Sequence, residues 1–287
     1  GSLSLRNNID GSKNTALGYA SLQNNTSGNS NVGLGNLALG GNTTGIENTA
    51  VGTSAMLGNQ PGSYNTGIGS YALQFSQSNG NTAIGSQAMF LTNSGNQNTA
   101  VGASAMFLNT TGSGNVAIGV NTMEKNTTGY SNVAVGMNAL SKNTNRNNLV
   151  AIGDSALFNN GTGSMTSTSG TGNTAVGSKA LYLNTSGQEN SAFGFNALFN
   201  NTSGLRQTAI GYKALYNNID GDYNAALGYN SMFQNTSGSY NASFGNFSLY
   251  NNVSGLYNAA FGYAALNNNT TADNNSAFGN LSLAANT

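Results

Sequence analysis

The chain has 287 residues, eight basic and eight acidic side chains, and a formal net charge of zero. So few basic residues form no stripe that could neutralise phosphates, which argues against nucleic-acid binding and against a polybasic membrane contact. No apolar run approaches the roughly 20 residues that a membrane-spanning helix needs. Because the chain has no His and no Cys, the usual catalytic bases and soft metal ligands are missing. We therefore expect neither an enzyme nor a bound cofactor or metal.

A repeat of 17 residues runs through the chain from its first complete unit, residues 14–30, which reads NTALGYASLQNNTSGNS. Later units begin at positions 31, 48, 65, 81, 98, 115, 132, 149, 173, 190, 207, 224, 241, 258 and 275. The unit at 65 is one residue short, and the unit at 149 carries seven extra residues within the stretch 161–172. A short fixed period is typical of a solenoid. We therefore expect a single repeat array of about 17 coils over residues 1–287.

Two columns of this repeat hold one residue type almost throughout. Position 1 is Asn in most units, beginning with Asn14, Asn31, Asn48, Asn65, Asn81 and Asn98. Position 5 is Gly, beginning with Gly18, Gly35, Gly52, Gly69, Gly85 and Gly102. The Asn column predicts a ladder of side-chain amides, each bonded to its equivalent in the neighbouring coils. The Gly column predicts a bend or a positive φ angle.

The remaining positions predict the fold class. Position 4 is apolar, position 9 is Leu or Met, positions 3 and 8 are small, and positions 12–15 usually read Asn-Thr-Ser/Thr-Gly, a turn composition. The segments between these features are only four or five residues long, which suits strands. The sequence therefore predicts an all-β, parallel β-roll or β-solenoid of stacked coils about 4.8 Å apart. We expect position 4 to point inward against position 9, and position 3 to form a flat outer surface of small residues.

Both ends of the sequence fall inside a unit, and neither resembles the atypical capping repeat that protects the end of a solenoid. We therefore expect this chain to be a fragment of a longer fibre, with its anchor and tip elsewhere. The insertion within 161–172 should protrude as a loop, either carrying a binding function or tolerated at a turn without one.

Aromatic residues are the candidate ligand contacts. Position 10 carries Phe90, Phe107, Phe158, Tyr182, Phe199, Tyr216, Phe233 and Tyr250, and position 17 carries Tyr64, Tyr223, Tyr240 and Tyr257. Exposed rows of this kind stack on sugar rings, whereas buried rows stabilise the coil or a contact between chains, and both interpretations stay open. The Phe residues at position 4, Phe193, Phe244, Phe261 and Phe278, look like core variation. Asp220 and Asp222 are the one close pair of carboxylates, in a turn that is either solvated or a weak Ca²⁺ site.

Several units match a known motif. The segments GNVAIG at 114–119 and SNVAVG at 131–136 closely resemble the Asn-Ser-Val-Ala-Ile-Gly motif of YadA-like trimeric autotransporter adhesin heads. The segment QTAIGYKALYNN at 207–218 looks like repeats of bacteriophage tail fibres. The resemblance implies a left-handed β-roll, a side-by-side homotrimer, and an extracellular place on a bacterial surface or a virion fibre. The adhesin-head repeat is typically shorter than 17 residues, so the extra residues here would enlarge the turn.

The leading hypothesis is a structural or adhesive segment of a trimeric fibre that attaches to a glycan or protein on a cell or environmental surface. An ice-binding β-solenoid is the alternative, because that function needs a regular outward row of Thr. Position 2 begins such a row with Thr15, Thr49, Thr66, Thr82 and Thr99, and breaks at Val116, Val133 and Val150.

Overall fold

A computed structural model describes residues 1–162 and 169–286 of the chain. Two compact units divide it, residues 1–145 and residues 146–287, and each is described by itself. Within the described residues all regular elements are strands, and no helix is present. The stretch 161–172, expected to form an insertion loop, lies partly outside these residues, because 163–168 are not described.

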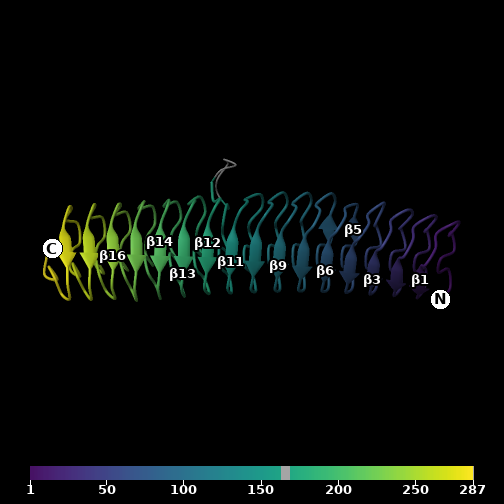
Figure 1. Cartoon of the computed structure of the whole chain (residues 1–287), viewed down its shortest axis with the longest axis horizontal. Helices are drawn as coiled ribbons and strands as arrows, with labels where there is room; N and C mark the ends of the chain where they lie inside the picture. Colours follow the sequence, from purple (N-terminus) through teal and green to yellow (C-terminus); the bar gives the residue numbers. More distant parts are fainter. Residues whose placement is uncertain (163–168, 287) are drawn as a thin grey trace. The chain divides into compact units, whose positions relative to one another are not determined.

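The first unit is a parallel sheet of eight short strands with one strand for each coil (Figure 1). The strands are β1 (Thr15–Leu17), β2 (Val32–Leu34), β3 (Thr49–Val51), β4 (Thr66–Ile68), β6 (Thr82–Ile84), β8 (Thr99–Val101), β9 (Val116–Ile118) and β10 (Val133–Val135). Equivalent repeat positions lie opposite each other, as Thr49 does to Thr66. A second sheet of two parallel strands, β5 (Phe75–Ser76) and β7 (Leu91–Thr92), belongs to the same unit.

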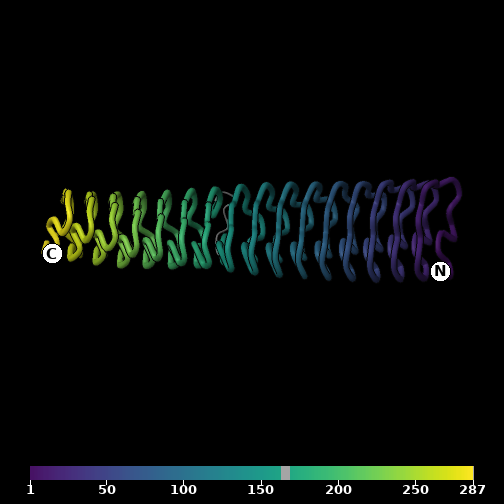
Figure 2. Tube along the Cα trace, turned by 60° about the horizontal axis from the view of Figure 1, so that its bottom comes forward, coloured from purple at the N-terminus to yellow at the C-terminus, as the bar shows by residue number. Residues whose placement is uncertain are grey.

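The second unit has the same architecture. Its strands are β11 (Val150–Ile152), β12 (Thr174–Val176), β13 (Ser191–Phe193), β14 (Thr208–Ile210), β15 (Ala225–Leu227), β16 (Ala242–Phe244), β17 (Ala259–Phe261) and β18 (Ser276–Phe278). They pair in parallel in chain order, and the register again matches equivalent positions, such as Ala225 with Ala242. Figure 2 shows the successive coils of each unit as flattened, stacked turns. The all-β parallel solenoid with coils of about 17 residues is thus confirmed.

The predicted direction of the strand side chains is wrong, because the two faces are exchanged. Position 3 is buried, with Ala50 and Ala100 both 0% exposed, whereas position 4 faces outward, with Ile68 37% exposed. The physical reason is the narrow interior. Position 9 fills that interior, as predicted, and a methyl group added at Gly67 in position 3 would lie 2.8 Å from Cγ of Met56 in position 9. The interior therefore has room for Ala, Ser or Gly opposite the long side chain, and the larger position-4 residue is left on the surface.

The Gly column meets a double requirement, which confirms the predicted positive φ. Gly52 has φ +129°, and a Cβ placed there would lie 2.7 Å from the carbonyl oxygen of Gly69 in the next coil. Residues with a side chain rarely adopt this region, and the close stacking leaves no space for one. Positions 7, 9 and 17 also have positive φ although they are not Gly, as Ala20 (52°), Leu22 (51°) and Ser30 (56°) show. That left-handed backbone was not expected, since ordinary residues adopt it at a cost of about 1–2 kcal/mol each.

The predicted Asn ladder exists, but its hydrogen bonds run mainly to the backbone. Oδ1 of Asn14 accepts from the backbone N–H of Asn31 (2.9 Å), and Nδ2 of Asn31 donates to the carbonyl of Gly45 (2.8 Å). Direct amide contacts accompany these bonds in some coils, such as Asn48 Nδ2 to Asn31 Oδ1 at 3.1 Å. The amide oxygen and nitrogen of Asn31 are therefore both satisfied within the coil stack, as burial requires.

A second Asn column, at position 12, forms the amide-to-amide ladder that was predicted for position 1. Nδ2 of Asn42 donates to Oδ1 of Asn25 (2.9 Å), and Nδ2 of Asn59 donates to Oδ1 of Asn42 (3.0 Å). The same Nδ2 atoms also donate to the Gly carbonyl three residues on, as from Asn42 to Gly45 at 3.1 Å. Position 12 thus links the coils and closes the turn at once.

Candidate functional site

The position-10 aromatic residues stack on each other along the coils. In the second unit six of them form one stack with centroids 5.2–5.3 Å apart and planes within 6–10° of parallel: Phe158, Tyr182, Phe199, Tyr216, Phe233 and Tyr250. In the first unit Phe90 and Phe107 stack at 5.0 Å. All eight rings are half-buried. Because neighbouring rings cover each other's faces, the interior of the stack offers only ring edges to a ligand. This geometry favours the coil-stabilising interpretation of the column.

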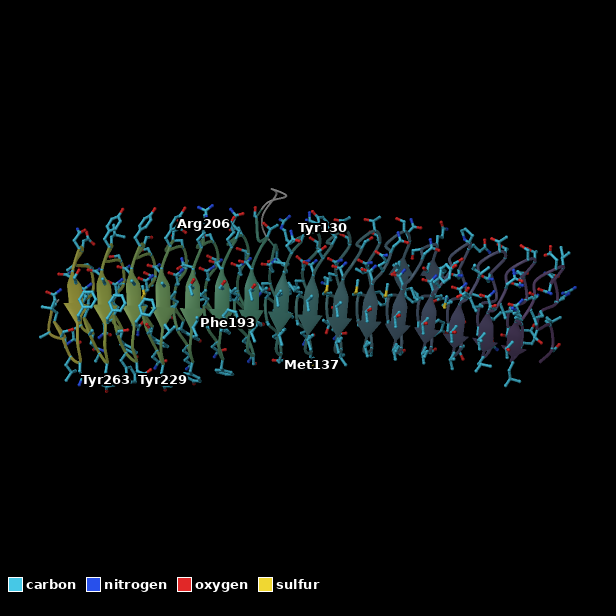
Figure 3. All side chains as sticks on the ribbon, in the orientation of Figure 1. Tyr130, Met137, Phe193, Arg206, Tyr229 and Tyr263 are labelled. Atoms are coloured by element: carbon cyan, nitrogen blue, oxygen red, sulfur yellow. The ribbon has the colours of Figure 1, made fainter. Side chains whose placement is uncertain are left out.

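Two further aromatic columns lie more openly on the second unit. At position 17, Tyr223, Tyr240 and Tyr257 stack at 5.0 Å and are 40–55% exposed. At position 6, which sequence reasoning missed, Phe195, Tyr212 and Tyr229 stack at 5.1–5.5 Å. Figure 3 shows Tyr229 and Tyr263 along one edge of the coils, Arg206 along the opposite edge, and Phe193 on the sheet face between them.

Arg206 forms the ion pair of this surface. Its Nε donates to a carboxylate oxygen of Glu189 (2.7 Å), and its Nη1 donates to the hydroxyl of Tyr223. The hydrogen bond to Glu189 is the main cause that raises the pKa of the Arg206 guanidinium, and the bond to Tyr223 adds to it. All three residues are exposed, so the cluster is a solvated surface feature.

The position-4 residues form an apolar column on the outer face of each main sheet, which we call the sheet-face column. In the first unit it comprises Leu17, Leu34, Val51, Ile68, Ile84, Val101, Ile118 and Val135. In the second it comprises Ile152, Val176, Phe193, Ile210, Leu227, Phe244, Phe261 and Phe278. The prediction that the Phe members are core residues is wrong, because Phe193 is 40% exposed and Phe278 is 70% exposed. Phe244, Phe261 and Phe278 stack on the surface at 4.9 Å.

A groove lies between the outward side chains of positions 11 and 13 in each unit. In the first unit Gly58, Phe75, Gln77, Leu91, Asn93 and Thr110 line a cavity of about 310 Å³ there. In the second unit the same columns carry amides that bond to each other, from Asn200 to Asn217 and from Asn217 to Gln234, both at 3.0 Å. Sequence reasoning missed the first cavity. The sequence did contain a signal for this cavity. One unit is a residue short there, and Phe75 and Leu91 occupy position 11, which is often Asn or Gly.

The carboxylates do not assemble into a site. Oδ1 of Asp222 accepts the backbone N–H of Leu205 in the preceding coil (2.7 Å), which is a structural role. Among the described residues no group of three or more acidic side chains could hold a metal ion. A search of the same residues for a helix long and apolar enough to cross a membrane found none.

The fold and these surfaces define the class of the protein as a parallel β-solenoid repeat protein with apolar, aromatic and amide columns on its outside. Comparison of the chain with family models, with curated proteins and with solved structures found no match.

Proposed function

We propose that the chain is a structural and adhesive segment of an extracellular homotrimeric fibre, on a bacterial surface or a virion. The sheet-face column is the observation that carries this proposal. A run of exposed Ile, Val, Leu and Phe on one face of a soluble protein is typical of an interaction surface. Its members recur at every coil, so a parallel copy in the same register would meet an equivalent residue at each step of about 4.8 Å.

A second copy of the chain fits the column better than a globular partner does. The column is one residue wide and repeats with the coil, and another solenoid of the same rise offers the matching pattern. Burying apolar surface contributes about 25 cal/mol per Å², so the stabilisation would grow with each added coil. The resemblance to trimeric adhesin heads supports three chains around one axis and a left-handed coil. A closed ring of three leaves no sheet-face column in contact with water.

The attachment partner in this proposal is a glycan or a protein on a cell or environmental surface. The outside of the coils supports an uncharged ligand over a charged one, because only 6% of the residues are charged and the net charge is zero. The resemblance to adhesin heads and tail fibres supports the extracellular location.

The mass of the protein in solution tests the assembly. Light scattering coupled to size-exclusion chromatography should give about three times the 29.1 kDa of the chain. The double variant Ile84→Lys/Ile118→Lys puts two charges into the sheet-face column and should lower the mass towards one chain. The control Ser94→Lys/Gln97→Lys adds the same charge at exposed positions outside the column and should leave the mass unchanged. A wild-type mass of one chain at all concentrations would refute the trimer.

Ice binding remains the second candidate because of one observation on the first unit. The strands β3, β4, β6 and β8 are consecutive in the sheet, and each begins with an outward, half-buried Thr at position 2. The row is bounded by Val at position 2 of β2 and of β9. Thermal hysteresis and shaping of ice crystals by the wild-type protein would favour this candidate, and their absence would remove it.

A further inference from the structure

The strongest departure from the repeat in the first unit lies where the short coil, residues 65–80, meets the coil that follows it. There β5 and β7 pair, with Phe75 opposite Leu91 and Ser76 opposite Thr92. Ser76 and Thr92 are fully buried, whereas Phe75 is 49% exposed and Leu91 is 37% exposed. Because side chains alternate along a strand, Phe75 and Leu91 point outward. Position 3 of the main sheet and position 12 both point into the coil, so these two residues lie on the face across the coil from the sheet-face column.

The amide ladder is interrupted at this place. Ser76 and Thr92 occupy position 12, where neighbouring coils have Asn59 and Asn109. The hydroxyl groups are satisfied internally: Ser76 Oγ bonds to Ser78 Oγ (2.8 Å), and Thr92 Oγ1 donates to the Met89 carbonyl (3.3 Å). The two coils thus keep their interior polar groups paired while position 11 on the outside becomes apolar.

Phe75 presents an open flank to solvent. Gly58 precedes it in the position-11 column, and a Cβ added to Gly58 would be 3.4 Å from Cδ1 of Phe75. No side chain therefore covers the ring from that coil. Phe90 meets the ring edge-on at 5.4 Å, which holds its orientation. The result is a cavity of about 310 Å³ with an aromatic floor.

Polar side chains form the rim of this cavity. The amides of Gln77 and Asn93 are exposed and have no hydrogen-bond partner among the described residues. Their backbones are fixed one coil apart, because Gln77 N–H donates to the Asn93 carbonyl (3.1 Å) and Asn93 N–H donates to that of Thr110 (3.0 Å). Thr110 Oγ1 donates to the Thr127 carbonyl (2.9 Å) and keeps its lone pairs as acceptors. None of the six lining residues is ionisable.

We propose that this cavity, which we call the Phe75 subsite, binds a ring of a neutral saccharide. A sugar ring has an apolar C–H face for the open flank of Phe75 and hydroxyl groups for the two amides, each of which supplies donors and an acceptor. The absence of charge in the lining disfavours phosphate and carboxylate ligands. The volume is at the small end of ligand pockets, which run from about 300 to 1,000 Å³, and suits one or two sugar rings. The inference rests on the proposed attachment function, for which it names the ligand class and the place.

The chain offers its own spectroscopic test, because it contains no Trp. The variant Phe75→Trp keeps an aromatic ring in the subsite and makes it the sole Trp. The matched control is Leu183→Trp, which puts the sole Trp at position 11 of the second unit, where the groove is lined mainly by amides and Thr. Each variant is titrated with cellotetraose, chitotetraose and galactotetraose, with the trisulfated disaccharide of heparin as the charged counterpart.

At least one neutral oligosaccharide should shift the Trp fluorescence emission of Phe75→Trp until the shift saturates. The same oligosaccharide should leave the Trp emission of Leu183→Trp unchanged. Binding of the same oligosaccharide to the wild type, measured by saturation-transfer NMR, should weaken at least tenfold in Phe75→Ala. It should weaken several-fold in Gln77→Ala/Asn93→Ala. Circular dichroism and mass identify a variant that has lost its fold; Phe75→Leu, which keeps an apolar side chain but removes the ring face, then serves in place of Phe75→Ala and should show the same loss of binding.

The subsite is refuted if none of the neutral oligosaccharides binds, if the heparin disaccharide alone binds, or if binding survives in Phe75→Ala. A protein of three chains that binds none of them would refute the Phe75 subsite and leave the fibre assembly standing. A single-chain protein whose binding disappears in Phe75→Ala would keep the subsite and refute the trimer. The two proposals therefore fail separately.

Discussion

The two units are built from the same type of coil and differ in the side chains on its outer surface. Their strands pair in the same register, and both have Gly at position 5 and, in most coils, Asn at position 1. The second unit has a six-ring stack at position 10, and bonded amides run from Asn200 to Gln234 at position 11. The first has a two-ring stack, a bonded amide pair at position 11 between Asn7 and Asn24, and an open apolar cavity at Phe75. The comparison teaches that the interior columns determine the fold and leave the outward columns free to vary. Function is therefore to be sought where an outward column departs from its neighbours.

The largest loss of stability should come from substituting the position-5 Gly, and it should be similar in both units because they have the same backbone conformation there. Gly52→Ala in the first unit and Gly153→Ala in the second place a Cβ at φ +129° and +134°, within 2.6–2.7 Å of a carbonyl oxygen of the next coil. Strain and overlap together should lower the free energy of unfolding by about 3–5 kcal/mol in each variant.

Denaturant unfolding monitored by circular dichroism measures this loss. The control is Gly114→Ala, where φ is +65° and nothing lies within 4 Å of the added Cβ, so a loss of about 1 kcal/mol is expected. Unequal losses for Gly52→Ala and Gly153→Ala would show that the two units do not depend equally on this column.

The amide ladder should separate an intact stretch, as in the second unit, from the interruption at β5 and β7 in the first. Asn218→Ala in the second unit removes the bond to Asn201 (2.8 Å) and takes from Asn235 Nδ2 one of its two acceptors (2.7 Å), leaving it the Gly238 carbonyl (3.0 Å). We expect a loss of about 2–4 kcal/mol, because buried polar groups lose their partners. Thr92→Val in the first unit, at the interruption, removes one weak bond to Met89 (3.3 Å) and should change stability by about 1 kcal/mol or less. Equal losses in the same unfolding experiment would contradict the view that the ladder is relaxed at β5 and β7.

Variants in the position-10 aromatic stacks should show the smallest difference in stability between the two units. Tyr216→Leu removes two ring pairs, with Phe199 (5.3 Å) and Phe233 (5.2 Å), and should lower the free energy of unfolding by about 1–3 kcal/mol. Phe107→Leu removes one pair with Phe90 (5.0 Å) and should lower it by about half as much. If neither variant changes the melting temperature, the rings do not stabilise the coil and the ligand-contact interpretation of position 10 gains weight.

The period, the strands and the Gly column could be predicted because they follow from residue spacing alone. The inward face of the strand could not, since alternation divides the residues into two sets without saying which set is inside. The usual preference for burying the larger residue points to Ile68 and its equivalents, but the space opposite Met56 admits only a small one. Because the interior is only as wide as one long side chain, the smaller residue of the strand is buried and the larger one is exposed.

The ladder at position 12 and the left-handed backbone at position 9 were hidden for a different reason. Asn25 and its equivalents stand in a segment whose composition indicates a turn, and a turn is compatible with many hydrogen-bond patterns. Leu22 and its equivalents look like ordinary core residues, and nothing in their side chains signals φ near 51°. The Phe75 cavity is lined by residues of four successive coils, with Gly58 beside the ring, so its shape emerges only when the coils are stacked.

The backbone hydrogen bonds between coils have a mechanical consequence. Within each unit most of them join a residue to one that lies 16–18 positions away in a neighbouring coil, as Leu22 N–H joins the Ala38 carbonyl and Met106 N–H joins the Thr122 carbonyl. A force applied to the end of a unit therefore acts on the hydrogen bonds of one coil at a time, and the coils open one after another. Each coil released would add about 50–55 Å of extended chain after subtraction of the rise it occupied. In the proposed fibre, a segment of this kind would lengthen under tension in many small, equal steps.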